Sequence, residues 1–168
     1  LGTITPGGTI GSAASSWNNF CMGGAGESVS CSYGIDQGAW FSFSTPATGF
    51  SGTVDIEAYN DPTGRGDGID LQIAVFSGSC GSLTEVDCEY DPGFSSESLT
   101  DVCLEPSTTY YILIDGGPLF GGVEGWFGLE VIDQGPYPAN DLPCDADLIT
   151  TQPENVYTTS TASGSNVG

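Results

Sequence analysis

Short segments with the polarity pattern of β-strands recur along the chain, and no segment shows the sustained spacing of an amphipathic helix. Strands place apolar side chains at every second position or collect β-branched and aromatic residues, whereas helices repeat apolar positions every three or four residues. Five segments fit the strand pattern: residues 39–44, 53–58, 71–76, 109–114 and 126–131. Segment 71–76 (LQIAVF) is the most apolar of these, which predicts a strand at the centre of a sheet.

Clusters rich in Gly, Pro and Asp separate the predicted strands. They lie at residues 45–46, 61–64, 77–78, 91–93, 105–107 and 116–118. These residue types favour tight turns because of their backbone freedom, fixed φ or local hydrogen bonding. Many short strands at this spacing predict an all-β fold, namely an antiparallel two-sheet β-sandwich of the jelly-roll type. A small β-barrel is the alternative.

The chain changes character near residue 136. Pro136 and Pro138 lack the N–H donors that a sheet needs, which predicts a linker. The motif at residues 140–148 (NDLPCDADL) follows, and residues 148–166 echo residues 1–19 at an offset of 147 (148 − 1). We therefore predict a β-sandwich repeat body at residues 1–138, with its opening motif truncated. Residues 139–168 then hold a linker and the first strand or strands of the next repeat, able to pack into a neighbouring unit.

The charge balance excludes several classes of partner. The chain has 22 acidic residues, a single basic residue (Arg65) and no His, which gives a formal net charge of −21. Nucleic acids and anionic membrane surfaces would be repelled by this charge. Nucleophilic catalysis lacks a His or Lys base, and the acids lie in predicted turns rather than in the facing pair that a glycosidase uses. We therefore expect a protein that is not an enzyme.

Six cysteines indicate disulfide bonds and an oxidising compartment. Zinc binding is disfavoured because the chain has no His and no CxxC motif. No signal peptide and no membrane-spanning stretch is evident, so export is expected to use a signal that was removed or lies outside this fragment. The expected pairs are Cys80–Cys88, across a predicted hairpin, Cys21–Cys31, around a Gly-rich loop, and Cys103–Cys144. Alternatively, Cys144 pairs within the next repeat.

Acidic loops are the strongest candidate for a binding site. Carboxylates on irregular loops suit Ca²⁺, which takes six to eight oxygen ligands. The candidate ligands are Asp67, Asp70, Glu89, Asp91, Asp36 and Asp61, and Asn60 could join them. The competing interpretation is that these are solvated turn residues, since Asp favours turns in any case.

The three tryptophans suggest packing rather than binding. Trp40 and Trp126 lie within predicted strands, so we expect both in the core. Trp17 lies in a Ser- and Asn-rich segment, where it could form an exposed sugar- or protein-binding patch with Phe20 and Tyr33. Packing of Trp17 under a loop is the simpler expectation.

Four stretches of the sequence resemble, in order, the bacterial pre-peptidase C-terminal-like domains. They are residues 39–49 (AWFSFSTPATG), 70–78 (DLQIAVFSG), 80–91 (CGSLTEVDCEYD) and 108–116 (TTYYILIDG). The motif at residues 140–148 is similar to the start of such domains in large repeat proteins of Bacteroidota, which are often exported by the type IX secretion system. The resemblance implies a β-sandwich, an accessory or adhesive role and no catalytic centre. The Gly-rich loop around Arg65 is longer than in that family, and Lys is missing.

Two functions follow as expectations. The first is a structural or adhesive tandem-repeat module of an extracellular filament or appendage on the cell surface. Its partners would be neighbouring repeats or identical subunits joined by strand exchange, and glycans or proteins of other cells. The second is a carbohydrate-binding accessory module of a secreted hydrolase.

Overall fold

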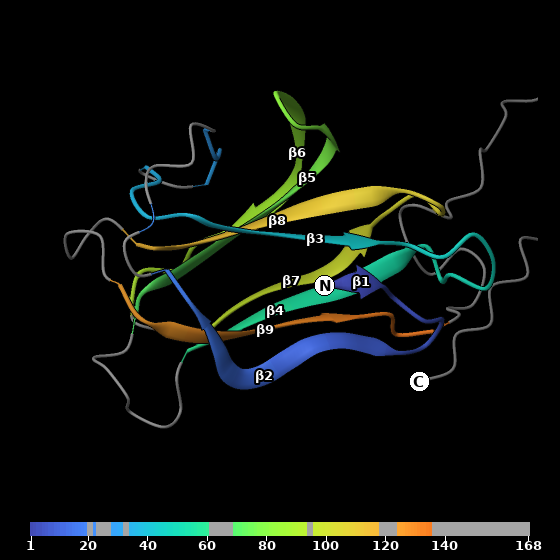
Figure 1. Ribbon diagram of the computed structural model, residues 1–168, viewed down its shortest axis with the longest axis horizontal. Helices are drawn as coiled ribbons and strands as arrows, with labels where there is room; N and C mark the ends of the chain where they lie inside the picture. The colour runs from blue at the N-terminus through green and yellow to red at the C-terminus, as the bar shows by residue number, and fades with distance from the viewer. Residues whose placement is uncertain are drawn as a thin grey trace, which may run out of the picture. The chain divides into compact units, whose positions relative to one another are not determined.

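Two β-sheets lie face to face in this protein (Figure 1). The structure is a computed structural model, and it describes residues 1–19, 22, 28–31, 34–60, 69–93, 96–117 and 124–135. The residues within these ranges form strands and turns without a helix, and in particular without one long and apolar enough to cross a membrane. The predicted all-β, two-sheet sandwich is therefore confirmed.

The first sheet, sheet A, has five strands. Their order is β1 (Gly2–Thr3), β3 (Ala39–Ser44), β8 (Thr109–Gly116), β5 (Leu71–Ser79) and β6 (Ser82–Glu89). All neighbours are antiparallel except β1, which runs parallel to β3. The second sheet, sheet B, is antiparallel, in the order β2 (Thr9–Asn18), β9 (Trp126–Ile132), β4 (Thr53–Asn60) and β7 (Glu97–Cys103).

The five strands expected from the polarity pattern are all present as β3, β4, β5, β8 and β9. Four strands were not among them. Strands β1 and β2 are short or built from Gly, Ser and Ala, which have no strong strand preference. Strand β7 begins with a buried acid, Glu97, and β6 alternates polar with mildly apolar residues, so neither carries a clear apolar face.

The main core lies between the two sheets, and alternation along each strand builds it. In β4, Val54, Ile56 and Ala58 are buried while the acids between them are half-buried. Phe43 of β3 and Leu129 of β9 fill the same layer. Removal of this apolar surface from water is the main force that holds the sheets together, at about 25 cal/mol for each Å² buried.

Strand β5 is buried on both of its faces, as expected for a central strand. All six residues from Leu71 to Phe76 are buried. Leu71, Ile73 and Val75 belong to the main core, whereas Ala74 and Phe76 belong to a second apolar cluster with Leu113 of β8. This second cluster lies on the outer face of sheet A.

A short part of the chain covers the second cluster on this outer face. We call residues 28–31 and 34–37 the covering segment. Its Val29 and Ile35 pack against the second cluster. A hollow lined by Val29, Ile35 and Leu113 has no space for a water molecule, so the contact is tight.

A disulfide bond holds the covering segment, and it corrects two predicted pairs. Cys31 is bonded to Cys88 of β6, with 6.0 Å between their Cα atoms, a separation within the usual range for a disulfide. The expected pairs Cys80–Cys88 and Cys21–Cys31 are therefore wrong. Cys88 pairs with Ala74 on β5, whereas Cys80 lies in the turn six residues beyond Ala74. At roughly 3.3 Å per strand residue, that puts the two about 20 Å apart.

The β5–β6 turn explains why Cys80 has no such partner. It consists of Cys80 and Gly81 between the paired residues Ser79 and Ser82. Gly81 has a φ of 85°, a left-handed conformation that glycine adopts without strain. Cys80 is exposed and outside any disulfide. Cys103 is disulfide-bonded, and its predicted pairing with Cys144 involves a residue outside the described part of the chain.

The chain divides into two compact units, Leu1–Pro136 and Tyr137–Gly168. The described residues all belong to the first unit. Residues 139–168, predicted to be a linker and the start of another repeat, lie outside the described residues, and their role stays a prediction.

Loss of the disulfide is expected to destabilise the fold strongly. The bond closes a loop with a sequence separation of 57 residues, for which the chain-entropy estimate is about 4 kcal/mol. Replacement of Cys31 and Cys88 together by Ser should lower the free energy of unfolding by about 3–4 kcal/mol in urea titrations. Cys80→Ser is the matched control and should change it by less than about 0.5 kcal/mol. Equal stability of the two variants would contradict the assigned pairing.

Candidate functional site

Trp40 is exposed, contrary to the prediction that it lies in the core. Its side chain retains 37% of its accessible surface. In β3 the residues Phe41 and Phe43 point toward sheet B, so Trp40 shares the opposite face with Ser42 and Ser44. The alternation with the two serines was the sequence signal for this orientation.

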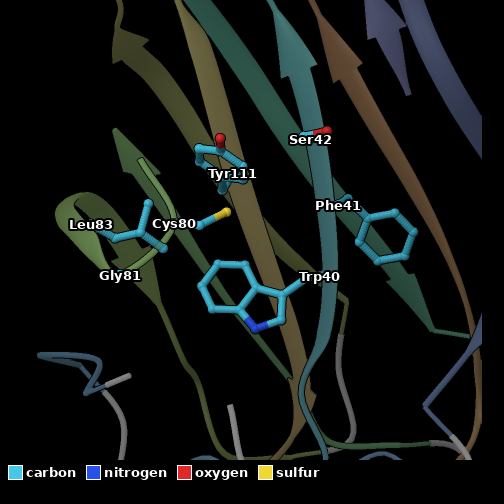
Figure 2. Close-up of a pocket in the computed structure, with 7 residues that line it drawn as sticks. All are labelled: Trp40, Phe41, Ser42, Cys80, Gly81, Leu83 and Tyr111. Carbon is cyan, nitrogen blue, oxygen red and sulfur yellow. The ribbon is translucent and has the colours of Figure 1, made fainter. Parts of the chain in front are cut away.

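The exposed Trp40 borders a hollow of about 400 Å³ on the outer face of sheet A, next to the covering segment. Figure 2 shows the residues that line it. They are Trp40, Phe41 and Ser42 of β3, Tyr111 of β8, and Cys80, Gly81 and Leu83 of the β5–β6 hairpin. We call this the Trp40 hollow. The indole of Trp40, the ring of Tyr111, and the side chains of Cys80 and Leu83 gather on one side of β3, while Phe41 points to the other side (Figure 2).

Paired strands hold the aromatic side chains in place. Tyr111 lies directly opposite Ser42 on one side and Phe76 on the other. The rings of Trp40 and Phe76 contact each other with centroids 5.4 Å apart and an angle of 52° between planes. Cross-strand neighbours on one face of a sheet are fixed by the backbone register. The register of the sheet therefore fixes the aromatic wall of the hollow, and the β5–β6 turn adds Cys80 and Gly81 to the lining.

The described residues that line the Trp40 hollow are mostly apolar and carry no charged side chain. Their polar side-chain groups are the indole N–H of Trp40, the hydroxyls of Ser42 and Tyr111 and the thiol of Cys80. Binding pockets combine such apolar walls with a few polar groups that orient the ligand. A flat ligand with apolar faces and hydrogen-bonding groups at its rim fits this arrangement.

The other two tryptophans do not form such a site. Trp17 of β2 packs edge-on against Phe41 with ring centroids 5.5 Å apart, and Phe41 packs in turn against Phe127. It packs at the margin of the main core, against strand β3 rather than under a loop as expected. Its suggested partners Phe20 and Tyr33 lie outside the described residues. Trp126 is half-buried and, by alternation with buried Phe127, faces away from the core. The core prediction for Trp126 is therefore wrong.

A buried carboxylate, Asp115 of β8, anchors the end of the covering segment. It is fully buried. Its Oδ2 accepts the backbone N–H of Asp36 at 2.8 Å, and its Oδ1 accepts those of Gln37 at 3.1 Å and Gly116 at 2.7 Å. The side-chain amide of Gln72 donates to Oδ2 at 3.2 Å. Buried charged groups persist only when they are hydrogen-bonded in this way.

Burial raises the pKa of Asp115, and the donated hydrogen bonds oppose that rise. No local sequence pattern distinguishes Asp115, because it follows an apolar run and precedes Gly116, where an aspartate resembles an ordinary turn residue. Its partners come from two distant segments, which no local pattern brings together.

Two of the predicted acidic loops do meet, through Asp70. Asp70 is fully buried, and its carboxylate accepts the hydroxyl of Tyr90 at 2.9 Å and the backbone N–H of Gly93 at 2.8 Å. The backbone N–H of Gly117 donates to its carbonyl oxygen. A Cβ at Gly117 would lie 2.6 Å from both Asp70 Oδ2 and Tyr90 Oη, so a larger residue there would have to displace these two side chains. Asp70 thus ties the loop after β6 to the end of sheet A.

The remaining calcium candidates are dispersed or lie outside the described residues. Asp36, Glu89 and Asp91 are exposed, and Asn60 accepts the N–H of Ile69 at 3.3 Å. Asp61 and Asp67 lie outside the described residues. Within the described part of the chain, no group of three or more acidic, Cys or His side chains is arranged to hold a metal ion. The calcium site stays a prediction.

A pair of glutamates on sheet B is bridged by a tyrosine. Glu57 of β4 and Glu130 of β9 lie directly opposite each other, an arrangement that is repulsive when both are charged. The hydroxyl of Tyr59 donates to Glu57 and lies 3.0 Å from Glu130 Oε2. Burial and the two carboxylates raise the pKa of Tyr59, so it remains a neutral donor that offsets the repulsion.

No protein-family model, curated protein or solved structure matches the chain. The resemblance to the pre-peptidase C-terminal-like domains therefore stays a prediction.

Replacement of Asp115 by Asn tests its role as an anchor. In the variant, the NH₂ group of Asn would replace one carboxylate oxygen, so the two N–H donors that this oxygen accepts in the unmodified protein would lose their acceptor. Each unsatisfied group costs about 1–3 kcal/mol. We expect the free energy of unfolding to fall by about 2–4 kcal/mol. Asp36→Asn is the control, because Asp36 contributes only its backbone N–H to this network. Equal stability of the two variants would rule out the anchor.

The pH dependence gives a second readout for Asp115. Between the ordinary pKa of an aspartate and the raised value, the folded chain keeps a proton on Asp115 that the unfolded chain has lost. The contribution of Asp115 to the free energy of unfolding therefore falls as pH rises through this window. The difference in stability between the protein and its Asp115→Asn variant should shrink over the same window.

Calcium binding can be tested through the melting temperature. A site that binds Ca²⁺ only in the folded state must raise the Tm when Ca²⁺ is in excess over its dissociation constant. The prediction requires a higher Tm in millimolar CaCl₂ than in EDTA, with MgCl₂ at the same ionic strength as the control. An identical Tm in all three conditions means that the acidic loops are solvated turns.

Proposed function

We propose that this chain is a non-catalytic adhesive module of an extracellular protein, and that it binds neutral carbohydrate at the Trp40 hollow. The proposal joins the two functions expected from the sequence, adhesion and carbohydrate binding. It places the contact on the outer face of sheet A.

The exposure of Trp40 is the observation that carries the proposal. A large aromatic side chain that keeps 37% of its surface in water on a rigid strand gains free energy when a ligand covers it. Trp and Tyr dominate the energetics of binding surfaces because they bury a large area and lose little side-chain freedom. Trp40 and Tyr111 border the same hollow.

The chemistry of the lining favours a sugar. The faces of a pyranose ring present C–H groups that pack against aromatic rings, while its rim presents hydroxyls. The hydroxyls of Ser42 and Tyr111 can serve as donors or acceptors to that rim. Because the chain carries a net charge of −21, anionic polysaccharides would be repelled. A neutral glycan meets no such barrier.

Two further observations support a binding role outside the cell. The described residues that line the Trp40 hollow include no carboxylate, whereas most glycoside hydrolases need two of them across the scissile bond. The Cys31–Cys88 disulfide suits an oxidising compartment. An adhesive or accessory module on the cell surface is consistent with both.

An assembly of tandem repeats is a second candidate function, and it can coexist with the first. The echo of residues 1–19 in residues 148–166 covers the part of the body that forms β1 and β2. These two strands belong to different sheets. A second copy of that segment could therefore form the first strands of another β-sandwich repeat.

Removal of the Trp40 ring should abolish adhesion to neutral polysaccharides. Trp40→Ala should lower retention on cellulose, mannan or β-1,3-glucan particles by at least about tenfold, because an aromatic ring buried by a ligand is worth about 1.4 kcal/mol or more. Val86→Ala is the control, since Val86 is similarly exposed but lies outside the hollow. Both variants should keep a cooperative unfolding transition. Retention that is equal in the two variants, or absent from the starting protein, would defeat the proposal.

A further inference from the structure

A second hollow adjoins the Trp40 hollow. It measures about 460 Å³ and is lined by Ser28, Val29, Ser30, Phe76, Leu83 and Glu85. We call it the Ser30 hollow. Leu83 lines both hollows, and Phe76 of the second is the ring that contacts Trp40 of the first. The two together extend from Trp40 on β3 to the covering segment.

The wall of the Ser30 hollow is fixed by bonds on both sides of Ser30. The backbone N–H of Ser30 donates to Glu85 Oε2 at 2.9 Å, and its hydroxyl donates to Glu85 Oε1. The next residue, Cys31, is covalently bonded to Cys88 on the same strand as Glu85. A wall held in this way loses little freedom when a ligand binds, which favours affinity.

The two hollows differ in chemistry. Among the described lining residues, those of the Trp40 hollow offer aromatic faces and no charged side chain, whereas those of the Ser30 hollow include a carboxylate and serine hydroxyls beside the Phe76 ring. The Glu85 carboxylate has more lone pairs than Ser30 uses, so it can accept hydroxyl donors. It repels anionic groups, which selects against acidic sugars.

We infer that the ligand is a linear neutral oligosaccharide that spans both hollows, with one ring on Trp40 and a later unit against Ser30 and Glu85. This inference rests on the proposed function, because it takes the Trp40 hollow as the primary contact. Glu85 and Ser30 are then the residues that determine how many sugar units contribute to affinity, and they select uncharged units.

Chain length of the ligand gives the test. Glucan and mannan oligosaccharides of one to six neutral units are titrated by calorimetry into the unmodified protein and its variants. The Kd should fall at least about tenfold between the shortest oligosaccharide that binds and one of five or six units, and then level off, because the second contact is intramolecular once the first has formed. Glu85→Ala and Ser30→Ala should bind the long oligosaccharides only as tightly as the short ones.

Controls separate this inference from the proposed function. Glu89→Ala removes a charge from the same strand outside both hollows and should keep the full gain with length. Unfolding transitions of all variants are recorded to show that they are folded. A gain with length that persists in both Glu85→Ala and Ser30→Ala would overturn the second subsite. So would Trp40-dependent binding without any gain with length, although the proposed function would then survive.

Two other outcomes defeat both ideas together. Absence of Trp40-dependent binding to every neutral oligosaccharide and polysaccharide would remove the primary contact. Salt-sensitive binding of a Lys- and Arg-rich peptide that depends on Trp40, with no binding of sugars, would assign the groove to a cationic partner held by cation–π contact and long-range charge.

Discussion

The apolar character of both faces of sheet A is the constraint on which the rest of the structure depends. Strand β5 buries six consecutive residues, and alternate side chains point to opposite faces of the sheet. Half of them therefore cannot pack into the core between the two sheets. The outer face therefore needs a cover of its own. The covering segment provides this cover for Ala74 and Leu113. The part of the outer face that the segment does not cover contains the Trp40 hollow.

The attachment of the covering segment combines three kinds of interaction. The Cys31–Cys88 disulfide fixes one end covalently, the Ser30–Glu85 hydrogen bonds align it with β6, and Asp115 receives the other end. Its apolar contacts are few, essentially Val29 and Ile35. A segment of this size could not stay in place by hydrophobic contact alone, because the entropic cost of ordering it exceeds the free energy gained by burying two side chains. The polar and covalent bonds therefore decide which part of sheet A remains open to a ligand.

The sequence predicted the fold better than the site, and particular residues explain why. Alternation located β3, β4, β5, β8 and β9, because strand formation follows the local pattern. The same alternation indicates the orientation of Trp40, which lies on the same face of β3 as Ser42 and on the opposite face from Phe43. The prediction that Trp40 lies in the core rested instead on the apolar character of its side chain. The Cys31–Cys88 bond and the hydrogen bond between Asp36 and Asp115 join segments more than 50 residues apart. No spacing in the sequence specifies such long-range contacts. The disulfides predicted between cysteines close together in the sequence were therefore wrong.

The most direct test of the account is the fluorescence of Trp40 itself. In a variant with Trp17→Phe and Trp126→Phe, Trp40 is the only indole, and its exposed ring should emit at long wavelength and be quenched readily by acrylamide. Addition of a neutral oligosaccharide that binds the chain should shift the emission to shorter wavelength and protect the ring from quenching. An emission spectrum and a quenching constant that stay the same while the sugar is demonstrably bound would contradict the account, since the ligand would then lie elsewhere.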